Sequence, residues 1–146
     1  MASGLTDAFA ELVLDHIFDA NGTVADGELS PTNWYLGLFT VLPGQDGTGG
    51  TEVSGTDYAR VSTGAGDWAA AGATAARALL NSAAITFPVV GAGGWGTVVG
   101  VGIWDASTAG DLRMIGSLTG GSVAFNEGSQ RQIAVGGASI SLGWTA

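Results

Sequence analysis

Few side chains in this sequence could carry out catalysis, because histidine and cysteine, two common catalytic residue types, are nearly absent. The 146 residues include one histidine, His16, and no cysteine, which excludes a thiolate nucleophile and leaves one position for a histidine base. His16 follows Asp15 in a segment with helical periodicity, so we expect it on a helix surface or packed against the fold. Residues 120–124 approximate a nucleophile elbow without its strand-to-helix setting, and we expect a turn there.

Carboxylates are the next candidates, because pairs of them carry out glycoside hydrolysis and clusters of them bind calcium. Asp105, Asp111 and Glu127 each lie at an expected strand end near Gly, Ser or Asn, where carboxylates commonly form turns. Asp46 and Glu52 flank a glycine-rich loop, but their spacing is not that of an EF-hand. We therefore expect no catalytic, cofactor-binding or metal-binding residue, and no enzyme activity.

Glycine and tryptophan patterns raise two further possibilities. Residues 91–96 match G-x-G-x-x-G, a dinucleotide-binding pattern that requires a helix to follow, whereas residues 97–104 have strand character. We therefore expect a glycine-rich turn. Tryptophans can stack on sugars, but they also bury large areas in cores and subunit interfaces, and we expect most of them there. The five are Trp34, Trp68, Trp95, Trp104 and Trp144.

The charge balance limits the partners. Thirteen acidic residues face four basic ones, all arginine, for a net charge of −9. A phosphate backbone or an anionic membrane surface would be repelled, so we expect neither nucleic acid nor membrane as a partner. Only 12% of the residues are charged while 46% are apolar, so part of the apolar area is expected to face other chains. We expect a homo-oligomer, with a trimer as the first choice.

The periodicity of apolar residues predicts one helix followed by strands. Apolar residues recur at helical steps over residues 5–19, with Thr6 or Ser3 as the N-cap and an Asn-Gly stop at 21–22. From about residue 33, short β-branched and aromatic runs alternate with turn residues, which predicts strands. Residues 43–52 form a polar loop, and residues 67–78 fit a helical turn or a mobile excursion equally. The expected strands are residues 34–41, 58–63, 83–87, 97–104, 111–118, 123–125, 132–135 and 138–142.

These elements predict a single domain spanning residues 1–146. Short strands at this spacing, with no second clear helix between them, favour antiparallel pairing over βαβ units. We expect a mainly β fold, an antiparallel β-sandwich or jelly-roll-like domain (33–146), with an N-terminal α-helix (1–22). The helix and the loop at 44–55 are candidate contacts with neighbouring molecules. An ordinary packed helix and a solvated loop are the equal alternatives.

Seven sequence blocks resemble a family of small tailed-bacteriophage virion proteins. Members are usually labelled phage tail fibre proteins, and they are similar in size and pattern to capsid decoration (cement) proteins. The resemblance covers residues 5 to about 140, and the chain departs from it at 64–79 and 99–102. The blocks are residues 34–40 (WYLGLFT), Pro43, 49–55 (GGTEVSG), 58–61 (YARV), 81–88 (NSAAITFP), 95–98 (WGTV) and 103–106 (IWDA).

The resemblance implies a structural protein of the virion, made in the cytoplasm of the bacterial host. A projecting fibre normally needs repeats or a coiled-coil shaft, and this sequence shows neither. We therefore expect a decoration protein that binds the major capsid protein, or other virion proteins, on the capsid surface. A tail fibre or tail-tip component is the alternative. A small glycan-cleaving enzyme is a third possibility, which activity on capsular polysaccharide would reveal.

Overall fold

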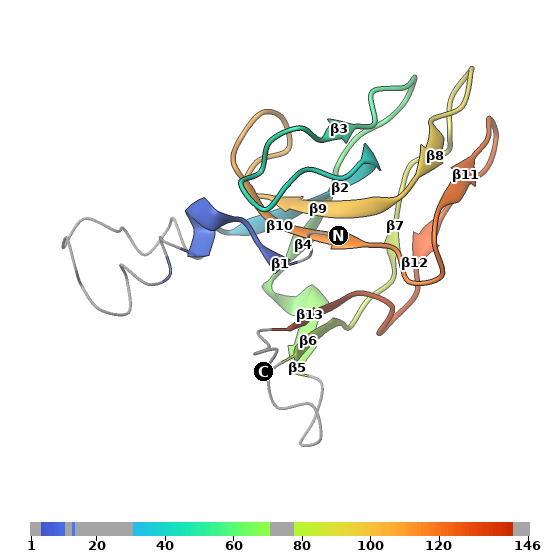
Figure 1. The fold of residues 1–146 in the computed structure, drawn as a ribbon. Helices are drawn as coiled ribbons and strands as arrows, with labels where there is room; N and C mark the ends of the chain where they lie inside the picture. The colour runs from blue at the N-terminus through green and yellow to red at the C-terminus, as the bar shows by residue number, and fades with distance from the viewer. Residues whose placement is uncertain (1–3, 11–12, 14–30, 71–77, 142–146) are drawn as a thin grey trace.

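The computed structural model describes residues 4–10, 13, 31–70 and 78–141, and it is mainly β with antiparallel strands and one short N-terminal helix. A six-stranded sheet forms the centre, in the order β1-β10-β9-β2-β3, with β4 also paired to β2 (Figure 1). We call it the main sheet. Its strands are β1 (Gly4–Leu5), β2 (Asn33–Val41), β3 (Thr51–Glu52), β4 (Val61–Gly64), β9 (Gly100–Trp104) and β10 (Leu112–Ser117).

Three ladders follow one another along a second layer, which we call the ribbon. Strands β6, β7 and β8 pair in turn with β13, β12 and β11, and β5 adds to the outer edge of β6. Between the ladders, Phe87 N donates to Arg131 O and Val90 N donates to Ser129 O, so the pairing continues across the gaps. Their bounds are β5 (Trp68–Ala70), β6 (Ala78–Asn81), β7 (Ile85–Thr86), β8 (Gly96–Val98), β11 (Val123–Phe125), β12 (Gln132–Ile133) and β13 (Ser139–Ser141).

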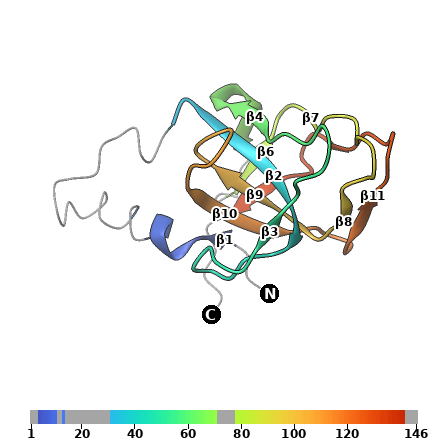
Figure 2. The same cartoon turned by 90° about the horizontal axis from the view of Figure 1, so that it is seen from above.

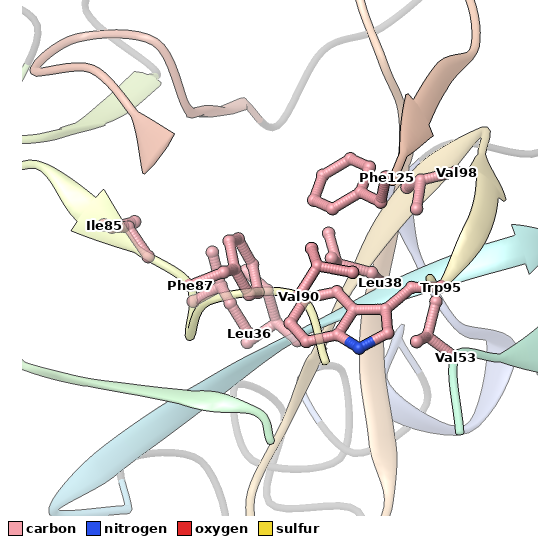
Figure 3. Packing of buried hydrophobic residues seen from close by; sticks show 10 residues of the cluster. Leu36, Leu38, Val53, Ile85, Phe87, Val90, Trp95, Val98 and Phe125 are labelled. Carbon is pink, nitrogen blue, oxygen red and sulfur yellow. The ribbon is translucent and has the colours of Figure 1, made fainter. Parts of the chain in front are cut away.

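The largest core lies between the main sheet and the ribbon. Leu36 and Leu38 of β2 point from the sheet toward ribbon side chains such as Phe87 and Val90 (Figure 3). Two layers that bury apolar faces against each other make a β-sandwich, and this architecture agrees with the sequence prediction. The buried members of this core are Leu36, Leu38, Val53, Ile85, Phe87, Val90, Trp95, Val98, Ile103 and Phe125.

A second cluster lies on the opposite face of the main sheet, which we call the outer face. Phe39 and Trp104 stack with ring centroids 5.2 Å apart, and Ile115 is buried beside them. Alternation along β2 explains why both faces are apolar, because successive side chains of a strand point to opposite sides. The main sheet therefore has buried apolar side chains on both faces.

The N-terminal helix begins at Asp7, two residues later than predicted. Leu5 instead lies in β1, where it pairs with Met114 of β10. Thr6 is the N-cap, one of the two residues predicted for that role: its Oγ1 accepts from Phe9 N at 3.4 Å and donates to Leu112 O at 2.9 Å. Phe9 packs edge-on against Trp34. The predicted end of the helix lies outside the described residues.

The predicted strands differ from the observed ones where the bounds of a strand depend on the strand it pairs with. Residues 97–104 contain two strands, because the chain passes from the ribbon to the main sheet at Val99, whose amide donates to Phe39 O. Strand β4 starts at residue 61 rather than 58, because Asp57 has a positive φ of 62° in the preceding turn. A short 3-10 helix, η1 (Ala65–Asp67), leads into β5 at 68–70, where the sequence allowed a helical turn or a mobile excursion over 67–78. Residues 71–77 of that stretch lie outside the described residues.

Candidate interaction site

A largely buried arginine side chain, that of Arg60, joins four segments on the outer face of the main sheet. Arg60 Nε and Nη2 donate to Glu52 Oε1 and Oε2 at 2.8 and 2.7 Å, a bidentate ion pair. Its Nη1 donates to the carbonyl oxygens of Ala106 and Ala109, and its guanidinium lies 3.9 Å from the Trp104 ring centroid. These contacts fix the loop between β9 and β10, so Arg60 serves the fold.

Tyr58 completes this cluster. Its hydroxyl donates to Glu52 Oε1 at 2.9 Å and accepts from Leu38 N at 2.8 Å. Burial raises the pKa of Tyr58 above its ordinary value, so the phenol stays protonated and keeps donating to the carboxylate. A Cβ at Gly37 would lie 2.7 Å from the Tyr58 hydroxyl and from Glu52 Oε1, so the cluster requires glycine at this position of β2.

Arg113 fixes the other side of the same loop. Its Nε and Nη2 donate to Asp105 Oδ2 at 3.1 and 2.7 Å, and its Nη2 lies 3.4 Å from Asp111 Oδ2. Asp105 Oδ1 accepts from Asp111 N at 2.8 Å, which closes the loop at its base. Both carboxylates therefore face the same guanidinium and hold the loop in place, and this structural role accounts for their position.

The third predicted carboxylate, Glu127, lies in a different turn. Its Oε2 accepts from Gly93 N at 3.2 Å, so it supports the glycine-rich turn at 91–94. Gly93 and Gly94 have positive φ angles of 87° and 73°, and β8 follows them where a dinucleotide site would need a helix. Residues 91–96 are thus a turn leading into a strand, as predicted, and Asp105, Asp111 and Glu127 serve loops and turns.

The two residues considered as calcium ligands have separate partners. Asp46 accepts from Thr48 N at 3.0 Å and from Thr48 Oγ1 at 2.8 Å, and these hydrogen bonds lower the pKa of Asp46. Glu52 pairs with Arg60. Among the residues that the structure describes, no group of three His, Asp or Glu side chains is placed to hold a metal ion. His16 lies outside them.

The tryptophans that the structure describes belong to the packing, as predicted for most of the five. Trp95 and Trp104 are buried, and Trp34 and Trp68 are half-buried against the larger core. Trp95 Nε1 donates to Thr56 O at 2.8 Å, so its polar atom is satisfied. Trp144 is not among the described residues. No stacking surface for sugars follows from these four.

An apolar hollow of about 240 Å³ opens between the main sheet and the ribbon, and the sequence did not predict it. Its lining brings together residues that lie up to 95 positions apart, so only the fold reveals it. Arg131 lies at this hollow, 6.0 Å from the Phe125 ring centroid, and it makes no ion pair with any described residue. The lining residues are Leu38, Phe87, Val101, Leu118, Val123, Phe125, Arg131, Gln132 and Ile133.

The loop at 44–55, predicted as a contact with neighbours, is partly built into the fold. Its last residues form β3 and the start of the larger core, where Val53 is buried. Residues 44–46 and 48–50 are exposed, and Gln45 O accepts from Asp7 N, which joins the loop to the start of the helix.

No helix in the described part of the chain is long and apolar enough to cross a membrane.

Comparison with known proteins agrees with the resemblance seen in the sequence. No curated protein matches the chain. The family model of podophage GP4 fiber I protein gp80 matches residues 4–141, which include every described strand. A match over nearly the whole length is one of family and not of a shared short motif. The chain therefore belongs to the podophage GP4 fiber I protein gp80 family and is a virion-associated structural protein of the phage fibre type.

Proposed function

We propose that this protein is a non-enzymatic fibre component of a tailed-phage particle, held there by contacts with other virion proteins. The observation that carries the proposal is the match of residues 4–141 to a family described as a fibre protein. The sequence favoured a capsid decoration protein because it shows no shaft. A family described as a fibre outweighs that argument, because a small module can also belong to a fibre that other chains extend.

The absence of catalysis is part of this proposal. It is supported by the carboxylates considered for glycan cleavage, since Asp105 and Asp111 share Arg113 and Glu127 supports a turn. Purified protein should leave capsular polysaccharide of the host at its original chain length. Release of oligosaccharides would overturn this part of the proposal.

Capsid decoration is the second candidate, and one observation favours it. The described residues form a body without a coiled-coil shaft, and a cap on a head shell needs only such a body. In this role the protein would bind the major capsid protein and add contact area across neighbouring subunits. Decorated shells would then resist heat better than bare ones.

The experiment that tests both is to image particles with and without this gene product. For a fibre component, density is lost at the tail and the head surface is unchanged. Loss of density on the head, with lower heat stability, would favour decoration. Unchanged particles, with the protein absent from them, would overturn both candidates.

We also propose that the protein assembles with itself, with a trimer as the first choice. High apolar content and few charges support self-association. Light scattering at micromolar concentration should give a mass above the 14.4 kDa of one chain. A strict monomer, both free and on the particle, would contradict this.

A further inference from the structure

The second layer of the sandwich is narrower than the main sheet. Among the described strands, β11 pairs only with β8 and β12 pairs only with β7, so one edge of each has no strand beside it. We call this side of the ribbon the open edge. An edge of this kind presents backbone amides and carbonyls that a further strand can pair with. The ribbon therefore has room for a strand that this part of the chain does not supply.

The apolar hollow lies along this open edge. Phe125 and Ile133 line it from β11 and β12, and Val101 lines it from β9 of the main sheet. Val101 and Ile133 remain half-buried, and Val123 is 37% exposed. In a closed sandwich such side chains would be covered by a neighbouring strand. Their exposure marks the place where the second layer is incomplete.

The size of the hollow suits side chains better than a small-molecule ligand. Its volume of about 240 Å³ is below the roughly 300–1,000 Å³ typical of small-molecule pockets. Its lining is apolar apart from Arg131 and Gln132. One or two apolar side chains of an added strand would fill it, because alternate residues of a strand point to the same side.

Arg131 defines the charge of the occupant. The other two described arginines, Arg60 and Arg113, are neutralised by Glu52 and Asp105, whereas Arg131 has no carboxylate partner among the described residues. In a chain of net charge −9, an exposed cation beside an apolar hollow selects for a partner carboxylate at that point.

We propose that the open edge receives an extended segment of another virion protein by strand addition. The segment pairs with β11 and β12, places apolar side chains in the hollow and sets a carboxylate on Arg131. This inference rests on the proposed function, because it takes the partner to be a virion protein. Edge-to-edge pairing of two copies of this chain is disfavoured, because a twofold axis would bring the two Arg131 side chains to one seam.

The test uses the purified full chain and two synthetic peptides as probes. Both are octapeptides of alternating valine and threonine with blocked ends, and one valine, on the side of the strand that faces the hollow and Arg131, is replaced by aspartate in the first and by lysine in the second. Amide signals in NMR spectra report binding. The aspartate peptide should shift the signals of Val123, Phe125 and Ile133. Arg131→Glu should weaken its binding about tenfold or more, the effect of removing one close charge pair.

Charge reversal makes the test specific. The Arg131→Glu protein should bind the lysine peptide better than the aspartate peptide, whereas the unmodified protein shows the opposite order. Val123→Asp should abolish binding of the aspartate peptide, and Val135→Asp is the matched control, because Val135 is 66% exposed and does not line the hollow. Unchanged melting temperatures of these variants show that each still folds.

Three outcomes would overturn the proposal. The first is no shift with either peptide at millimolar concentration, and the second is a set of shifts away from β11 and β12. The third is dimerisation of the free protein that Val123→Asp abolishes, because the occupant would then be a second copy. These outcomes are distinct from failure of the proposed function, which is absence of the protein from the particle.

Discussion

The two faces of the main sheet are closed by different means. On the outer face, Arg60, Glu52 and the hydroxyl of Tyr58 form a hydrogen-bonded layer over Gly37 and the indole of Trp104. The ring of Tyr58 packs against the larger core. On the inner face, the ribbon covers the sheet with apolar side chains, and the covering ends at the open edge. One face is sealed by ion pairs, and the other is apolar and incomplete. Figure 2 shows β8 and β11 at the end of the molecule farthest from the N-terminal helix.

The two faces use the few charges of the chain differently. Two of its four arginines are held inside ion pairs that fix one loop, and neither is available to a partner. Arg131 alone among the described arginines lacks such a pair, and it lies at the incomplete face. Binding at the open edge should therefore rest mainly on apolar contact and backbone pairing, with one salt-sensitive contribution.

Among substitutions on the outer face, Arg60→Met should destabilise the protein most. The substitution leaves Glu52 half-buried without its cation and two carbonyl oxygens without their donor. Loss of one partner of a fully buried ion pair costs about 3–5 kcal/mol, and because the Glu52 side chain is 26% exposed we expect about 2–4 kcal/mol here, still a large share of a typical folding free energy. Urea unfolding of the purified protein measures it. Arg60→Lys keeps the charge but not the bidentate geometry, so its unfolding midpoint should lie between those of the unmodified protein and Arg60→Met. A midpoint unchanged by Arg60→Met would show that the outer face does not depend on this cluster.

Gly37→Ala tests the same face from beneath the cluster. The added Cβ would lie 2.7 Å from Glu52 Oε1, the Tyr58 hydroxyl and Trp104 Cζ3, so these groups must move. Overpacking of this kind costs about 1–3 kcal/mol. Gly66→Ala is the control, because nothing lies within 4 Å of a Cβ there and its stability should be unchanged. Equal melting curves for the two variants would contradict the close packing over Gly37.

Sequence reasoning found the elements whose pattern is local. Residues 34–41 and 123–125 were predicted as strands and agree with β2 and β11 within one residue, since their composition alone favours strands. Strands β1 and β3 have two residues each and exist only because they pair with β10 and β2, so no local pattern announces them. The pairing of Glu52 with Arg60 depends on the turn between them. The hollow depends on which strands face each other, and periodicity does not determine that.

At the open edge, Val123→Asp should change the stability of the protein little, in contrast to Arg60→Met on the outer face. Val123 is already 37% exposed, and surface substitutions away from buried features change stability by about 0.5 kcal/mol or less. Urea unfolding should give a midpoint close to that of the unmodified protein. A loss as large as that of Arg60→Met would mean that Val123 belongs to the closed core and that the inner face is complete.

The smallest effect on stability is expected at Asp46, in the exposed loop beside the outer face. Hydrogen bonds from the backbone and side chain of Thr48 lower the pKa of this carboxyl below its ordinary value of 3.8. A carboxyl with a lowered folded-state pKa stabilises the fold above its unfolded-state pKa, and the contribution is lost as the pH falls through the folded-state value. Because Asp46 is fully exposed, solvent screens this effect. Urea unfolding of the unmodified protein and of Thr48→Val should therefore give the same midpoint above pH 5. Thr48→Val removes only the side-chain donor, so NMR titration should show the pKa of Asp46 rising part of the way toward 3.8, since the backbone bond contributes most. A pKa that does not move would mean that the threonine hydroxyl does not hold this loop.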